Sequence, residues 1–204
     1  MRCYHLCNFY LAGVHAGIQS AHTQHELAIK YLASTPYRNL AADESINEYG
    51  TRLDLFHDAK AEYIEWANNH KTMILLNGGM MSHLVEFETF LAENSHAYAW
   101  SSFREEEAAL NGALTNIGIV LPEHMYRWSR QILKFVDTPD QGFTNRSEDC
   151  TDDIIAIERI GAGAKHTVEL SVDHTKDGNV KVYFYTKFDI ELLRKLAPLR
   201  LMGA

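Results

Sequence analysis

Cysteine is scarce in this chain, and its three residues, Cys3, Cys7 and Cys150, are too few for a disulfide framework. None of them forms the Cys-x-x-Cys pair of a structural zinc site. Long apolar runs are missing too, because no segment approaches the roughly 20 consecutive apolar residues of a membrane-spanning helix. The first residues lack the apolar core and cleavage site of a secretory signal peptide. These absences predict a cytoplasmic protein with reduced thiols and no membrane partner.

Positive charge is also in short supply, since 19 Lys and Arg stand against 27 Asp and Glu, for a net charge of −8. Broad polyanion binding needs a basic surface, so tRNA or a nucleotide would have to bind through a local patch. Neither a Gly-x-Gly-x-x-Gly motif nor a P-loop occurs, which disfavours dinucleotide and nucleoside triphosphate enzymes. What is present, 46% hydrophobic residues in a chain of 204, suffices for a sizeable core.

Short apolar segments alternate with helix-like patterns over the first two thirds of the chain. Strands are expected at 3–10, 71–77, 96–103 and 114–122, and helices at 16–33, 54–69, 82–93 and 123–136. The first helix carries an apolar stripe formed by Ile18, Ala21, His25, Ala28 and Leu32. His25 is therefore expected to be a hydrogen-bonded core histidine. The segment 34–53 is expected to be a loop-rich insertion. This alternation predicts an α/β sandwich around a parallel or mixed sheet.

The periodicity changes after residue 136. The acidic segment 137–153, with Pro139 and Gly142, predicts a linker. Beyond it, alternating segments at 154–160, 167–173 and 180–186 are typical of strands, and "TKDGN" is a hairpin signal. A last helix, capped by Asp189, is expected to run to about 196. We therefore expect an α/β domain over 1–136, a linker over 137–153 and a small module over 154–204 with an antiparallel β-meander and one helix.

Four motifs in the first 135 residues resemble the type 2 peptidyl-tRNA hydrolases, and most closely the short proteins of this kind carried by tailed bacteriophages. The opening strand leads to a Gln-x-x-His pair, and "WANNHKTMILLNGG" stands where the family has its second strand. "SHLVEFETFLAEN" leads into "YAWSSFREEE", and "ALTNIGIVLP" resembles the family's last strand. The resemblance implies a three-layer sandwich with a four-stranded mixed sheet. It also implies hydrolysis of the ester in peptidyl-tRNA or a related acyl-nucleotide, in the host cytoplasm if a phage encodes the chain.

The resemblance implies catalytic residues at the start of the first helix. Gln19 and His22 form the Gln-x-x-His pair and are expected to position the substrate. The family has a lysine four residues before the glutamine, whereas this chain has His15. Histidine titrates near neutrality and lacks a fixed ammonium, so the lysine's role does not carry over unchanged.

The other implied catalytic residues follow the third strand, where the family has an aspartate and a threonine. This chain has three consecutive glutamates there, and Thr115 opens the next strand. Glu105 or Glu106 is expected to act with His15 in proton transfer or electrostatics, and Thr115 is expected to bind substrate. The alternatives are a solvated turn for the glutamates and an exposed polar residue at a helix start for Gln19.

Further substrate contacts are expected from Asn77, which precedes Gly78-Gly79 at the end of a buried strand, and from Arg127 and Arg130. The two arginines share one face of the helix expected at 123–136 and could form the local basic patch. A simple strand-to-helix turn and a solvated helix face are the alternatives. The histidines of the first helix lack the His-Glu-x-x-His pattern, so neither a metal nor another cofactor is expected.

Several functions therefore remain open. The first is a peptidyl-tRNA hydrolase-like enzyme. The second is a catalytically altered binding module that sequesters tRNA, a nucleotide or a host protein, including a phage anti-defence role, and the third is a histidine-based metal hydrolase. A homodimer is a further option. The enzyme hypothesis requires the start of the first helix and the acidic segment after the third strand to meet at one site.

Overall fold

The computed structural model describes residues 1–33, 46–94, 98–137, 153–162, 165–174 and 179–202. The chain divides into two compact units, which are Met1–Glu123 with Leu199–Ala204 (unit 1) and His124–Pro198 (unit 2). Most of the expected linker, 137–153, lies outside the described residues. The expected domain boundaries stay a prediction.

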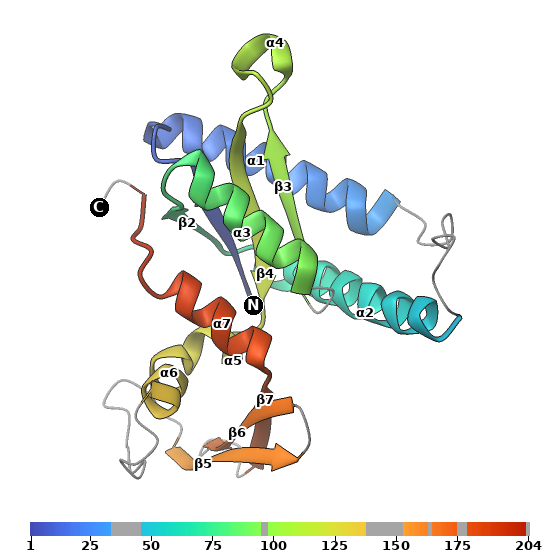
Figure 1. Cartoon of the computed structure of the whole chain (residues 1–204), viewed down its shortest axis with the longest axis vertical. Helices are drawn as coiled ribbons and strands as arrows, with labels where there is room; N and C mark the ends of the chain where they lie inside the picture. Colours follow the sequence, from blue (N-terminus) through green and yellow to red (C-terminus); the bar gives the residue numbers. More distant parts are fainter. Residues whose placement is uncertain (34–45, 95–97, 138–152, 163–164, 175–178, 203–204) are drawn as a thin grey trace. The chain divides into compact units, whose positions relative to one another are not determined.

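Unit 1 contains a four-stranded mixed sheet of order β2-β1-β4-β3 (Figure 1). Its strands are β1 (Arg2–Cys7), β2 (Met73–Asn77), β3 (Trp100–Arg104) and β4 (Leu114–Leu121). β1 pairs in parallel with β2, whereas β4 pairs antiparallel with both β1 and β3. Every residue of β4 is buried, as expected for a central strand covered on both faces. The predicted α/β fold with a four-stranded mixed sheet is confirmed.

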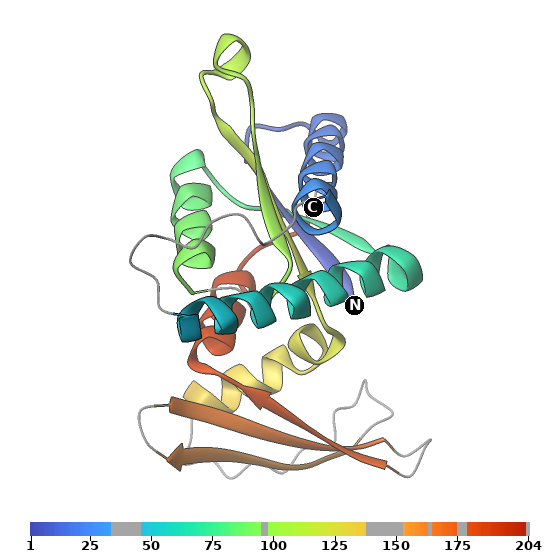
Figure 2. The same ribbon diagram turned by 90° about the vertical axis from the view of Figure 1, so that its right-hand side faces the viewer.

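Helices cover this sheet on both faces, with α1 on one face and α3 on the other (Figure 2). The helical segments of unit 1 are α1 (Gly13–Ala28), η1 (Ile29–Ala33), α2 (Ile46–Glu65), η3 (Trp66–His70), α3 (Met81–Asn94) and α4 (Glu107–Leu110), of which η1 and η3 are π-helical. The expected loop-rich insertion is wrong for residues 46–53, which form the first turns of α2, while 34–45 lie outside the described residues.

The core beside α1 combines residues from the helices with residues from the sheet. It comprises Cys3, Leu27, Tyr31, Ala59, Tyr63, Trp66, Ala99 and Val120. A β-carbon at Gly118 of β4 would lie 2.9 Å from the Thr23 side chain and 3.2 Å from that of His5. Because glycine lacks this atom, α1 approaches the sheet closely at this position.

The orientation of α1 is the reverse of the prediction. Its buried residues are Ala16, Ser20, Thr23 and Leu27, whereas Ile18, His25 and Leu32 of the expected apolar stripe are exposed. The prediction of a core histidine at position 25 is therefore wrong. The reason lies in the sheet, whose side chains beneath α1 include the buried polar residues His5 and Asn116 and so favour a polar helix face.

Unit 2 contains a three-stranded antiparallel sheet of order β5-β6-β7 and the helix α7. Its elements are β5 (Asp153–Ala162), β6 (Lys165–His174), β7 (Asn179–Tyr185), α6 (Ser129–Asp137) and α7 (Lys187–Leu196). Val168, Leu170 and Val172 of β6 are buried. The N-cap of α7 is Thr186, which forms a capping box with Asp189, so the predicted cap at Asp189 is three residues late.

The helix expected at 123–136 is divided into α5 (Glu123–Arg127) and α6. The division falls at Trp128, which is almost completely buried. Arg127 therefore ends one helix while Arg130 lies on the next, and the single basic helix face predicted for them is wrong.

The last described residues belong to unit 1, because they pair with β2. Leu201 forms an antiparallel bridge with Leu76, the Asn77 amide donates to the Arg200 carbonyl at 2.7 Å, and the Met202 amide donates to that of Leu75 at 2.9 Å. These bonds occupy part of the outer edge of β2. Across the described parts of the chain, no helix has both the length and the apolarity that a bilayer span requires.

Candidate functional site

Gln19 lies at the centre of a small polar cluster on the α1 side of the sheet. Its Nε2 donates to Glu105 Oε1 at 2.5 Å, and its Oε1 accepts from Thr115 Oγ1 at 3.3 Å. These two bonds assign the amide, because an ionised carboxylate only accepts hydrogen bonds. Three segments that are far apart in the sequence thus meet at one side chain, which we call the Gln19 cluster.

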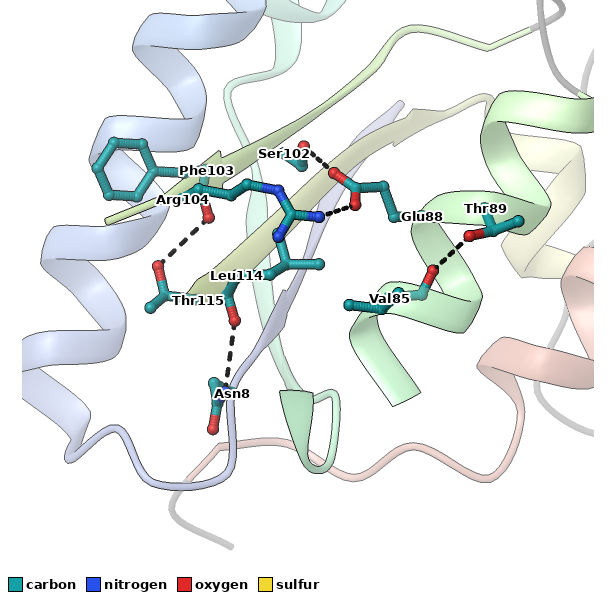
Figure 3. Close-up of polar contacts among 9 residues, drawn as sticks. All are labelled: Asn8, Val85, Glu88, Thr89, Ser102, Phe103, Arg104, Leu114 and Thr115. Carbon is teal, nitrogen blue, oxygen red and sulfur yellow. Dashed lines mark hydrogen bonds and ion pairs between the residues drawn. The ribbon is translucent and has the colours of Figure 1, made fainter. Parts of the chain in front are cut away.

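The end of β3 explains how Glu105 reaches this cluster. Successive strand residues point to opposite faces, so Phe103 lies on the α1 side while Arg104 pairs with Glu88 of α3 (Figure 3). The β3–β4 register shifts between Phe103 and Arg104, and the Glu105 amide then donates to the Ala113 carbonyl at 3.0 Å. The same alternation returns the Glu105 side chain to the α1 side, where it meets Gln19.

Thr115 is held at the start of β4. Its Oγ1 also lies 3.4 Å from the Phe103 carbonyl, and its own carbonyl accepts from the Asn8 amide at 2.9 Å. The Asn8 side chain donates to the adjacent Leu114 carbonyl (Figure 3). The hydroxyl of Thr115 therefore lies between α1 and β3, the bonds with Asn8 hold the backbone at this position, and the residue is buried.

His22 lies one turn after Gln19 and stacks on Phe103. The ring centroids are 4.6 Å apart and the ring planes differ by 13°. His22 is exposed and Phe103 is half-buried. The pair presents a flat aromatic surface next to the Gln19 cluster.

The remaining predicted catalytic residues are not brought into this cluster by any contact. His15 is exposed, and among the described residues it has no hydrogen-bond or ion-pair partner. Glu106 is exposed and immediately precedes α4, without a side-chain cap bond. The roles predicted for His15 and Glu106 stay predictions.

The other predicted substrate-binding residues, Asn77, Arg127 and Arg130, have no described contact with the Gln19 cluster. Asn77 Oδ1 accepts from the Gly79 amide at 2.9 Å, an arrangement that stabilises the turn between β2 and α3. The Arg127 guanidinium lies over the Trp128 ring at 5.3 Å. Arg130 belongs to unit 2, and its predicted share in a nucleic-acid patch with Arg127 stays a prediction.

A buried polar layer, which was not predicted from the sequence, lies between α1 and the sheet. His5 Nδ1 pairs with Asn116 Oδ1 at 2.9 Å, and His5 Nε2 lies 2.6 Å from Gln24 Nε2. Asn116 Nδ2 in turn donates to Cys7 Sγ at 3.2 Å and to Ser20 Oγ at 3.3 Å. This network requires the proton on His5 Nδ1, so that Nε2 accepts from Gln24.

Burial sets the protonation of this layer. Burial lowers the pKa of His5 to about 4, although the hydrogen bond that His5 donates to Asn116 acts in the opposite direction. It also raises the pKa of the Cys3 thiol to about 12 and that of Cys7 above its ordinary value. The layer is therefore uncharged at neutral pH. It anchors α1 through Ser20, which adjoins Gln19 in the chain, and so fixes the backbone that carries the amide.

The Gln19 cluster offers a carboxylate, an amide and a hydroxyl within one hydrogen-bonded group. A carboxylate can accept a proton from water, and the other two can donate to an oxygen that gains negative charge. No group of three or more His, Cys, Asp or Glu residues suited to a metal occurs among the residues that the structure describes. No protein-family model matches the chain, and neither does any curated protein.

Proposed function

We propose that the chain is a hydrolase of the type 2 peptidyl-tRNA hydrolase kind, which cleaves the ester of peptidyl-tRNA or of a related acyl-nucleotide. We assign to unit 1 the three-layer sandwich of that family. The sheet order β2-β1-β4-β3 and the helices α1 and α3 on opposite faces support this assignment. The observation that carries the proposal is the contact of Gln19 with Glu105 and Thr115.

In the proposed reaction, Glu105 accepts a proton from water while the water oxygen attacks the ester carbonyl carbon. Substrate takes the place of Glu105 at the Gln19 amide, whose N–H groups then donate to the carbonyl oxygen as it becomes an oxyanion. The ester C–O bond breaks, and the ribose oxygen leaves as a hydroxyl after receiving a proton. We assign the donation of that proton to His22, which is exposed one turn after Gln19. Exchange with solvent then removes the proton from Glu105 and restores that of His22.

His15 has a different part in this proposal. It lies in the first turn of α1, where free backbone N–H groups favour anions. We assign to it an electrostatic contact with a phosphate of the substrate, in place of the lysine that the family has.

The test uses tRNA charged with diacetyl-lysine, and it follows release of the blocked amino acid by the purified full-length protein. Gln19→Ala and Glu105→Gln should each lower kcat by about 100-fold, a loss typical of a removed oxyanion donor or general base. Glu107→Gln is the matched control, because this exposed carboxylate lies two residues away on α4. Unchanged turnover in both cluster variants would exclude the mechanism.

One observation favours a second candidate, a binding module. The Gln19 amide is paired within the protein on both its oxygen and its nitrogen, which is also what a site without turnover would show. Such a module would bind tRNA with an affinity that falls steeply as salt rises, without cleaving the ester. Binding without turnover in the same assay would select this candidate.

A further inference from the structure

The strand β3 forms an edge of the four-stranded sheet, opposite the edge formed by β2. In an antiparallel pair, alternate residues direct their backbone N–H and C=O groups toward the neighbouring strand, and the residues between them direct these groups outward. The Val120 amide of β4 donates to the Ala99 carbonyl at 2.8 Å, so the odd-numbered positions of this segment bond to β4. The even-numbered positions face outward. They are Trp100, Ser102 and Arg104.

Two side chains of η1 cover the first of these outward positions. The Trp100 amide donates to Tyr31 Oη at 3.1 Å, and the Trp100 carbonyl accepts from Lys30 Nζ at 2.9 Å. Within the part of the chain that the structure describes, no group bonds to the outward backbone of Ser102 or Arg104. The part of the edge from Ser102 to Arg104, which we call the open edge, can therefore receive a further strand.

The open edge leads directly into the Gln19 cluster. Glu105 follows Arg104 in the chain, and its amide donates to the Ala113 carbonyl, so the alternation continues past the register shift. Its side chain meets Gln19 on the α1 side. A peptide paired with the open edge would therefore have one end beside the carboxylate and the amide that we assign to ester cleavage.

The chemistry of the open edge selects an extended peptide as its occupant. Backbone N–H and C=O groups repeat along the edge, and the main chain of an extended peptide carries the complementary repeat whatever its side chains are. The phosphates and bases of a nucleic acid lack this repeat. An enzyme that cleaves peptidyl esters must accept peptides of many sequences, and main-chain pairing meets this need.

We propose, on the basis of the proposed function, that the open edge binds the peptide part of the substrate as an added strand. Because the esterified end lies at Glu105, the added strand runs parallel to β3. The covered position at Trp100 limits how much of the peptide can pair. In a parallel pair the bonds of one residue reach the two neighbours of the residue opposite, so Ser102 and Arg104 engage a span of about five peptide residues. Residues further from the ester leave the edge and add no further bonds.

Kinetics with a series of substrates test the proposal. The wild-type protein receives tRNA charged with N-acetylated alanine peptides of one to eight residues, and kcat/KM is measured for each. The value should rise by about 10-fold up to the five-residue peptide and then stay constant, because each main-chain bond adds a modest amount to binding. A constant kcat/KM over the series would overturn the proposal and leave the proposed function standing. Absence of cleavage in every member would defeat both.

N-methylation of the peptide identifies main-chain pairing in the wild-type protein. In an added strand only alternate N–H groups face β3. N-methylation of the five-residue substrate should therefore lower kcat/KM at alternate positions and have little effect at the positions between them. An equal loss at every position would contradict an added strand.

A matched pair of variants at Ser102 locates the added strand on β3. Ser102→Pro and Ser102→Ala both lose the bond from the Ser102 hydroxyl to Glu88 (Figure 3), but only proline also lacks the outward N–H. Ser102→Pro should lower the ratio of kcat/KM between the five-residue and one-residue substrates by at least about 3-fold, whereas Ser102→Ala should retain the ratio. Circular dichroism checks that both variants fold.

An unchanged ratio in a folded Ser102→Pro protein would exclude pairing on β3 and overturn the proposal. Sedimentation velocity of the same two variants detects the other occupant that a strand edge can take. A wild-type dimer that Ser102→Pro dissociates and Ser102→Ala does not would assign the open edge to a second copy of the chain, which would also overturn the proposal.

Discussion

The helices α1 and α7 differ in the kind of residue that they bury. α7 buries Ile190, Leu192 and Leu193 within unit 2 and exposes Arg194 and Lys195. α1 instead buries the polar residues Ser20 and Thr23, together with Ala16 and Leu27, against the sheet of unit 1, and it exposes Val14 and Ile18. The difference teaches that the neighbour selects which side of a helix is buried. A sheet carrying hydrogen-bonding groups binds a polar helix face, and the apolar residues then face outward.

Removing an apolar side chain should distinguish the two helices most clearly. Leu193→Ala in α7 should lower the free energy of unfolding of its unit by about 2–5 kcal/mol, because it leaves a cavity in a packed core. Ile18→Ala in α1 should change the free energy of unfolding of unit 1 by no more than about 0.5 kcal/mol, because Ile18 is exposed. Urea denaturation followed by circular dichroism measures both, and similar losses would refute the difference.

Acid should weaken the contact of α1 with the sheet. The native state keeps His5 neutral down to its pKa of about 4, whereas in the unfolded chain it binds a proton below the ordinary value of 6.5. The unfolded state therefore binds more protons between these values, and stability falls by about 3 kcal/mol as pH decreases through this window. His5→Gln removes this dependence and leaves the titration of carboxylates unchanged. The stability difference between wild type and variant should therefore shrink toward pH 4.

Loss of Asn116 should show how much the buried polar layer contributes. Asn116→Ala leaves the Nδ1–H of His5 buried without an acceptor, so unit 1 should lose about 2 kcal/mol of stability. Asn69→Ala is the control, because Asn69 is exposed and bonds only to Glu65, also exposed, in the described contacts. Thermal denaturation compares the two, and equal melting temperatures would show that the layer contributes little.

The helix caps should give the smallest effects, with opposite signs. Thr186→Ala removes the capping box of α7 and should destabilise unit 2 by about 1 kcal/mol. The N-cap of α1 is Ala12, which has extended backbone and no side-chain bond. Ala12→Asp should therefore stabilise unit 1 by up to about 1 kcal/mol. The measurement is again thermal denaturation, and a stabilising Thr186→Ala would contradict the contrast.

The sequence predicted the sheet better than the helices. The apolar runs at 71–77 and 114–122 have few alternatives to a buried strand, so the strands were found with small errors at their ends. The break at Trp128 was missed because neither proline nor glycine marks it. The orientation of α1 was reversed because an apolar stripe was assumed to face the core, while the polarity of the sheet depends on distant residues such as Asn116.

The candidate site, too, was predicted only in part. Gln19 and the glutamates were predicted together from a resemblance in motif order, and the structure brings Gln19 and Glu105 into contact. Neither the Phe103 partner of His22 nor the His5 layer was found. The alternation of Cys3, His5 and Cys7 along one face of β1 was the available signal, but it indicates a polar layer only once Ser20 and Gln24 are known to lie above it.

The return of residues 199–202 to the edge of β2 means that unit 2 is inserted into unit 1 rather than appended to it. A chain shortened after residue 136 would lose the cover of Leu76 and leave part of the edge of β2 open to other chains. Isolating unit 1 would instead require excision of 124–198 and a short linker joining Glu123 to Leu199.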